Sequence, residues 1–92
     1  MTAVETHKRH VTVETVFEIA GAGPIQSHYH RIFPDVATVK TIDGRLIGVS
    51  VHGPIVKKDG TAGLNSVETY FSGSDRDEMP DWLRQLAESC EG

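Results

Sequence analysis

The sequence predicts a mainly β fold of the α+β class: an antiparallel meander of about five strands, with one C-terminal amphipathic helix packed on the sheet. Three observations predict it. Apolar and polar residues alternate over residues 10–19, which is the period of a half-buried strand. Asp43-Gly44 separates two further runs of β type. After Pro80, apolar residues recur with the period of a helix.

The first strand is expected over residues 10–19, with two faces of different polarity. One face is apolar apart from a threonine and carries Val11, Val13, Thr15, Phe17 and Ile19. The other face is polar apart from a valine and carries His10, Thr12, Glu14, Val16 and Glu18. Gly21 to Pro24 end this strand, since proline cannot donate to a ladder. A second strand is expected over residues 25–33, ending at Pro34.

The next two strands, residues 36–42 and 45–51, form a hairpin around Asp43-Gly44. Aspartate followed by glycine favours a type I′ turn, because both central residues need a positive φ. A two-residue loop then places Ile42 opposite Arg45 and Thr41 opposite Leu46, and farther along it pairs Thr38 with Val49, Val36 with Val51 and Asp35 with His52. The face with Val36, Val49 and Val51 is expected to be the more apolar one.

A fifth strand is expected over residues 64–71, with both faces partly covered because each carries aromatic or large aliphatic residues. The helix follows in the acidic segment. Pro80 suits its first turn, where a missing N–H leaves no hydrogen bond unmade. The stripe expected to pack on the sheet consists of Met79, Trp82, Leu83, Leu86, Ala87 and Cys90.

Charge is distributed unevenly along the 92 residues. The formal net charge is −4, and residues 74–92 account for all of it, with six acids against two arginines. This balance argues against nucleic acid as the main partner, since phosphate binding needs a basic face. No apolar run reaches the length of a transmembrane helix, so no membrane association is expected.

The chain is interpreted as a single domain over residues 1–92. Residues 1–9 are expected to fray, residues 10–73 to form the β-sheet region and residues 74–92 to form the helix region. Cys90 is the single cysteine, so no intramolecular disulfide can form. Small secreted domains usually carry several disulfides, and the first ten residues lack the apolar stretch of a signal peptide. A cytoplasmic location is therefore expected.

Histidines supply the one candidate for metal chemistry. His28 and His30 lie two apart and would face the same side of a strand, and His52 could supply a third ligand from another strand. Asp35 could then orient His52 or bind the metal. The competing interpretation is a set of exposed histidines on a solvated face. Because nothing brings these strands together in the sequence, we expect no catalytic residues, no metal and no cofactor.

Association with another chain is expected on grounds of packing. The later strands carry more apolar surface than one short helix can cover, which favours a homodimer or a larger oligomer. The candidate interface residues are Trp82, Leu46 and Val39. For Trp82 the preferred interpretation is a core residue, and an exposed interface anchor is the alternative.

The C-terminal segment from Asp77 to Ala87 resembles the ending of many small uncharacterised proteins of actinobacteria and their phages. The shared pattern is acid, acid, apolar, proline, acid, tryptophan, then an amphipathic helix. This resemblance implies an origin and a layout. The leading interpretation is a non-enzymatic protein-interaction module, such as a phage or prophage accessory protein that binds a host or phage protein. The alternatives are a metal-binding protein or metal-dependent enzyme using His28, His30 and His52, and a structural component of a phage particle.

Overall fold

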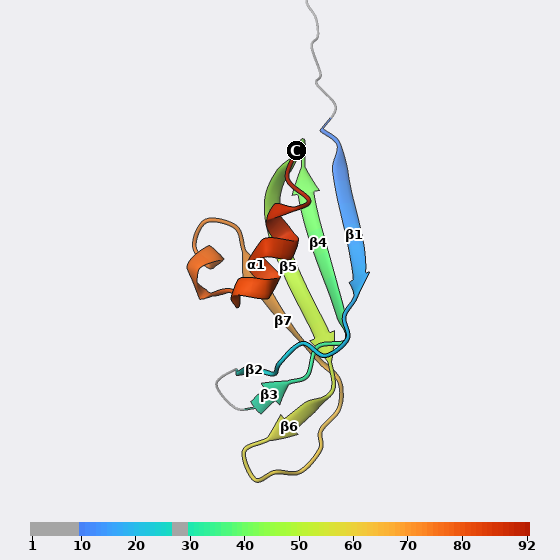
Figure 1. Cartoon of the computed structure of the whole chain (residues 1–92), viewed down its shortest axis with the longest axis vertical. Coiled ribbons are helices and arrows are strands. Elements are labelled where there is room, and N and C mark those ends of the chain that lie inside the picture. Colours follow the sequence, from blue (N-terminus) through green and yellow to red (C-terminus); the bar gives the residue numbers. More distant parts are fainter. Residues whose placement is uncertain (1–9, 27–29) are drawn as a thin grey trace, which may run out of the picture.

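The computed structural model describes residues 10–26 and 30–92, which form two antiparallel sheets and one C-terminal α-helix (Figure 1). The larger sheet has the order β1-β4-β5-β7, with β1 at Thr12–Glu18, β4 at Val36–Ile42, β5 at Arg45–Gly53 and β7 at Ser66–Phe71. The smaller sheet has the order β2-β3-β6, with β2 at Ile25–Gln26, β3 at His30–Ile32 and β6 at Ile55–Lys57. A 3₁₀ turn at Arg76–Glu78 precedes α1 at Asp81–Glu88.

The predicted class, mainly β with one C-terminal helix, is confirmed. The order of strands differs from a simple meander, because β1 pairs with β4 and the segment between them belongs to the smaller sheet. Prolines mark where the chain passes between the sheets: the N–H of Phe33 donates to the carbonyl oxygen of Pro54 at 2.9 Å. The two segments meet closely there, since a Cβ on Gly53 would collide with the carbonyl oxygen of Phe33.

The predicted hairpin turn is confirmed. Asp43 has φ 52° and Gly44 has φ 79°, the left-handed conformations that a type I′ turn requires. The predicted pairs Ile42 with Arg45 and Thr41 with Leu46 are also present.

Beyond those two pairs the predicted register is wrong, because a β-bulge interrupts the ladder between Lys40 and Thr41. The bulge leaves Ile47 without an opposite residue, and the pairs beyond it are Lys40 with Gly48, Thr38 with Ser50 and Val36 with His52. A slip of one residue turns a strand's side chains to the other face. The buried face therefore combines residues that the predicted register separates, namely Ala37, Val39, Thr41, Leu46, Val49 and Val51.

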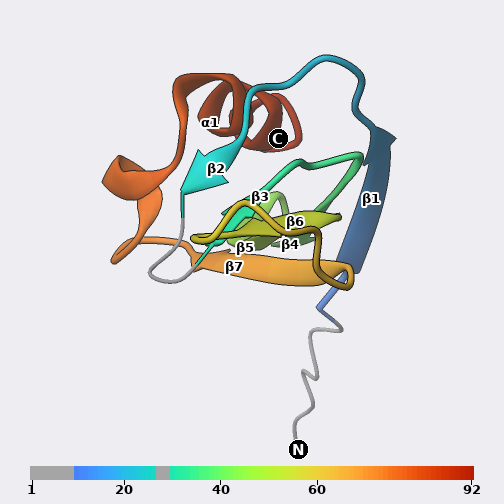
Figure 2. The same ribbon diagram turned by 90° about the horizontal axis from the view of Figure 1, so that it is seen from below.

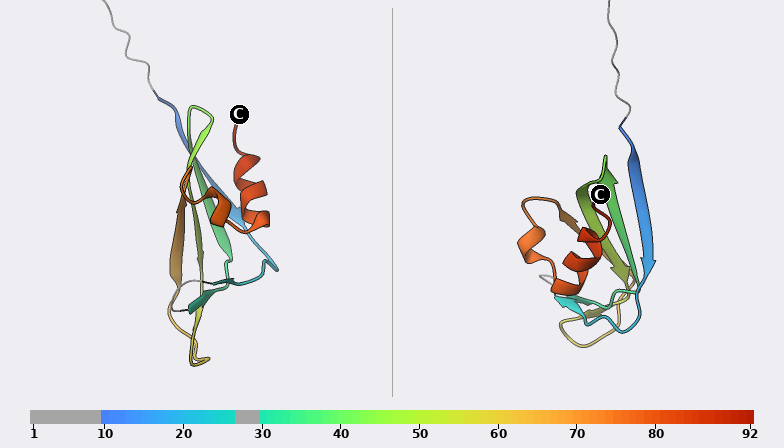
Figure 3. Two further views of the ribbon diagram at one scale, coloured as in Figure 1. Left: turned by 90° about the vertical axis from the view of Figure 1, so that its left-hand side faces the viewer. Right: turned by 45° about the horizontal axis from the view of Figure 1, so that its top comes forward.

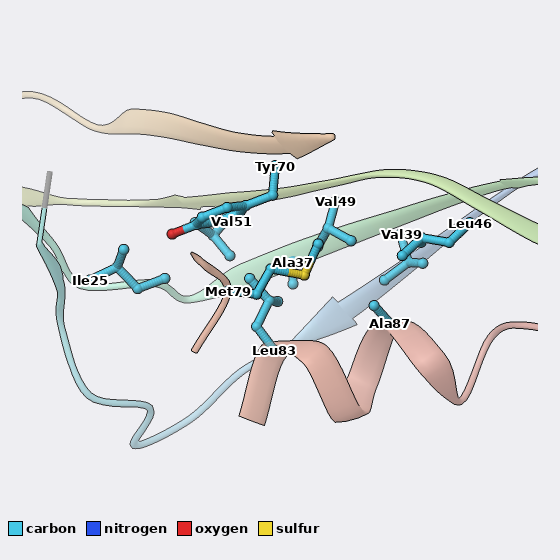
Figure 4. Close-up of a cluster of buried hydrophobic side chains, with 10 residues drawn as sticks. All are labelled: Ile25, Ala37, Val39, Leu46, Val49, Val51, Tyr70, Met79, Leu83 and Ala87. Carbon is cyan, nitrogen blue, oxygen red and sulfur yellow. The ribbon is translucent and has the colours of Figure 1, made fainter. Parts of the chain in front are cut away.

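The core lies between this face and the C-terminal segment (Figure 4). Leu83 and Ala87 point from α1 onto the sheet and are completely buried, and Met79 is buried just before the helix. Trp82, Leu86 and Cys90 pack against the same cluster and stay partly exposed. The predicted apolar stripe of the helix is therefore confirmed.

The opposite side of the larger sheet carries no described element (Figure 3). The expectation that both faces of the last strand are partly covered fails for one face. Tyr70 is buried beneath the C-terminal segment, whereas Val67 and Phe71 lie on the helix-free face and are exposed. The strand also begins later than predicted, and Leu64 precedes it in an exposed loop. None of the described helices is long and apolar enough to cross a membrane.

Candidate functional site

The histidines singled out from the sequence lie in different sheets where the structure describes them. His30 is in β3 of the smaller sheet, and His52 is in β5 of the larger sheet. His28 lies outside the described residues. Within residues 10–26 and 30–92, no three His, Cys, Asp or Glu side chains are arranged to hold a metal ion. Asp35 contacts the strand of His52 through its backbone, where its N–H donates to the carbonyl oxygen of His52 at 2.9 Å.

Two of the three predicted interface residues lie inside the core. Val39 is completely buried and Leu46 is nearly so, because both lie on the face of the sheet that α1 covers. Neither can contact a second chain while the helix stays in place, so the prediction is corrected for both. Trp82 is partly buried against the core, which agrees with its interpretation as a core residue.

The exposed apolar side chains point to another surface. On the helix-free face of the larger sheet, Val16 in β1 and Phe71 in β7 are 64% and 61% exposed, and Val67 is about half exposed. Between the two edges lies a groove of about 350 Å³, and Gly48 at its centre provides no side chain to fill it. The polar groups of the groove come from Glu14, Thr38, Lys40, Ser50 and Thr69.

The polar groups of this groove largely pair with one another. The hydroxyl groups of Ser50 and Thr69 lie 3.2 Å apart across β5 and β7. Nζ of Lys40 lies 3.7 Å from Oε1 of Glu14 across β4 and β1. Both charged groups are exposed, where such a pair contributes little to stability. The helix-free face is therefore a shallow surface with apolar residues near both edges and a neutral, mutually paired centre.

The two edge strands of the sheet differ in how their outer backbone groups are used. At β7, the N–H of Phe71 donates to Oδ2 of Asp75 at 2.8 Å, and the N–H of Asp75 donates to the carbonyl oxygen of Phe71 at 3.0 Å. The turn after β7 thus occupies one end of that edge. At β1, no comparable contact with the outer groups is present among the described residues. Figure 2 shows no described element alongside the outer edge of this strand.

Asp43 fixes the start of β1 to the hairpin. Its Oδ2 lies 2.6 Å from Nδ1 of His10, and its Oδ1 accepts from the N–H of Val11 at 2.8 Å. These two hydrogen bonds hold the pKa of the Asp43 carboxyl below its usual value, that of His10 having the larger effect. The other end of the described chain meets the same turn, because the N–H of Gly92 donates to the carbonyl oxygen of Gly44 at 3.1 Å.

The smaller sheet gathers basic residues that are scattered in the sequence. Arg31 from β3 lies with Lys57 and Lys58 around a hollow of about 230 Å³. In the acidic C-terminal segment, Arg76 pairs with Glu91 at 3.2 Å and with Glu88 at 3.3 Å. Glu91 chiefly, with Glu88, raises the pKa of Arg76.

Sequence reasoning missed the free edge and the turn at Asp75. One signal for the edge is present in the sequence: Val16 is the apolar interruption on the polar face of the first strand. No comparable signal exists for Asp75, because its role depends on the turn after β7 folding back onto Phe71. Comparison with known protein families, curated proteins and solved structures gives no match to this chain.

Proposed function

We propose that this chain is a non-enzymatic protein-interaction module that self-associates through its four-stranded sheet. The observation that carries the proposal is the position of its exposed apolar residues. Of the large apolar side chains that are exposed, five lie on β1, β7 or just before β1: Val11, Val13, Val16, Val67 and Phe71. Three of them gather along one edge: Val11 and Val13 lie on the helix side of β1 and Val16 lies on its helix-free face. Exposed apolar groups gathered along one edge are typical of an interface.

The chemistry of the described acids supports a non-enzymatic role. The carboxylates with shifted pKa values, Asp43 and Asp59, are exposed and have lowered pKa values because of hydrogen bonds in turns, to His10 and Thr61 respectively. A general base working near neutral pH needs a raised pKa, so a lowered one makes each carboxylate a weaker base. Tyr70 has a raised pKa, chiefly from burial in the core.

The resemblance of the C-terminal segment to small proteins of actinobacteria and their phages supports a role as a phage or prophage accessory protein. The partner would be a second copy of the chain together with a host or phage protein. The single cysteine, Cys90, supports a location in the cytoplasm.

Sedimentation equilibrium of the untagged chain tests the proposal. A dimer is expected at micromolar concentration, because apolar residues of two copies would be removed from water. A monomer at every accessible concentration would contradict self-association. Assembly into large particles would instead favour a structural component of a phage particle.

A further inference from the structure

The outer edge of β1 presents a regular row of backbone groups. The carbonyl oxygen of Val11 accepts from Asp43, and the N–H of Ile19 donates to Asp35, so the odd-numbered residues direct their backbone groups toward β4. Alternate residues of a strand point opposite ways in the plane of the sheet. The backbone groups of Thr12, Glu14, Val16 and Glu18 therefore point outward.

This edge lacks several of the features that usually protect an edge strand, and its charged residues are the two glutamates Glu14 and Glu18. The seven residues from Thr12 to Glu18 contain no lysine and no proline. All seven pair with β4 in one uninterrupted register, so no bulge twists the edge away. An exposed edge of this kind is a template for another strand.

We infer that β1 pairs antiparallel with β1 of a second copy, in the register that places Thr15 opposite the partner's Thr15. This inference rests on the proposed self-association and adds its geometry. The row that faces the helix side is symmetric in polarity about Thr15, with two apolar residues on either side: Val11 and Val13 before it, Phe17 and Ile19 after it. A symmetric strand matches a second copy of itself.

Charge selects the same register. Outward residues must face outward residues, so three registers pair most of β1: those centred on Glu14, Thr15 and Val16. Centring on Glu14 opposes two copies of Glu14, and centring on Val16 opposes Glu14 to the partner's Glu18. Like charges directly opposite are destabilising. The register centred on Thr15 instead opposes Glu14 to the partner's Val16 and Glu18 to the partner's Thr12.

The chosen register also covers the apolar residues exposed near β1. It places Val13, which is 47% exposed, opposite the partner's Phe17, and Val11, which is 61% exposed, opposite the partner's Ile19. The two-fold axis runs perpendicular to the sheet, so the pair forms one eight-stranded sheet with both helices on the same side. The turn at Asp75 occupies one end of each outer edge, which disfavours the addition of further copies there.

Two substitutions of one exposed residue test the register. Val16→Glu would place a carboxylate opposite the partner's Glu14, twice in each dimer, and the dimer dissociation constant should rise about tenfold or more. Val16→Lys would place an ammonium group there, and the dissociation constant should stay within about threefold of the parent value or fall.

The controls separate charge from general damage. Val67→Glu places the same charge on the same face at the other edge strand and should leave the dissociation constant unchanged. Adding Glu14→Lys to Val16→Glu should restore dimerisation, because a lysine then faces each introduced glutamate. The single variants at Val16 and Val67 should keep the unfolding midpoint of the parent in the monomer, since both residues are exposed.

Sedimentation equilibrium of the full chain distinguishes the outcomes. Weakening by Val16→Glu but not by Val16→Lys supports the register. Equal weakening by both, or no effect of either on a parent that self-associates, overturns the register while self-association stands. A parent chain that is monomeric throughout overturns both proposals. Pairing of β1 with a strand of another protein, without self-pairing, also overturns the inference.

Discussion

The two edge strands of the four-stranded sheet, β1 and β7, are similar in length. They differ in whether their outer backbone groups are free to pair with another strand. Each has one neighbour, β4 for β1 and β5 for β7. At β7, Asp75 binds both outer backbone groups of Phe71. At β1, the contacts with Asp43 hold the strand onto the sheet and leave its outer groups open. The segment after an edge strand can therefore decide whether that edge accepts a partner.

The two sides of β1 also have different roles. The inner groups of β1 stabilise the fold of one copy, whereas we propose that its outer groups stabilise only the dimer. Substitutions at neighbouring positions of β1 should then affect different properties, and this is the basis of the first prediction.

The largest expected effect comes from proline in β1. Thr15→Pro removes an N–H directed toward β4 and leaves a carbonyl oxygen of β4 unpaired, so it should lower the free energy of unfolding by about 2 kcal/mol or more. Val16→Pro removes an outward N–H and should cost about 1 kcal/mol or less, while it disrupts dimerisation. Chemical denaturation and sedimentation measure the two properties. Equal costs for both variants would contradict the assigned directions of the backbone groups.

A smaller effect is expected from opening the second edge. Asp75→Ala removes the acceptor for the N–H of Phe71 and should lower the free energy of unfolding by about 1 kcal/mol. With the obstruction gone, dimers should associate further through β7, and light scattering should detect species larger than a dimer. Asp75→Asn keeps an oxygen acceptor and is the matched control. An Asp75→Ala protein that remains a dimer would show that Asp75 does not protect this edge.

The smallest effect concerns pH and the start of β1. Because hydrogen bonds to His10 and Val11 hold the pKa of Asp43 below its usual 3.8, ionised Asp43 stabilises the folded chain above about pH 4. That contribution should be lost as the pH falls through the folded pKa. Thermal unfolding of the parent should therefore lose more stability below pH 4 than unfolding of Asp43→Asn does. Parallel pH profiles would contradict this role of Asp43.

The sequence pattern predicted the features that depend on residues close together in the chain. The alternation around Phe17, the Asp43-Gly44 turn and the stripe containing Leu83 depend on residues near one another in the chain, and the structure bears them out. The order of strands and the buried face of the hairpin could not be predicted this way. The bulge beside Lys40 changes the face of each β5 residue beyond it relative to β4. Val49 and Val51 thereby join Val39 in the core beneath α1, which is distant in sequence.

The residues of the candidate surface could not be predicted from the sequence. Association through the sheet was expected from excess apolar surface, but Val39 and Leu46 were chosen from the face that the helix covers. The face that the helix covers depends on tertiary packing, and the residues of the other face are therefore the exposed ones. Val16 was visible as an exception in the alternation, and its exposure gives that exception a physical meaning.

Disulfide trapping at the centre of β1 tests the proposed pairing most directly. In the Thr15-centred register, the two Thr15 residues form a non-hydrogen-bonded pair with Cα atoms about 4.5 Å apart, within the range that a disulfide spans. In a Cys90→Ser background, Thr15→Cys should therefore give a covalent dimer on mild oxidation. Glu14→Cys should not, because it faces the partner's Val16 instead of its own equivalent. Absence of the Thr15→Cys dimer, or equal cross-linking of both variants, would contradict the register.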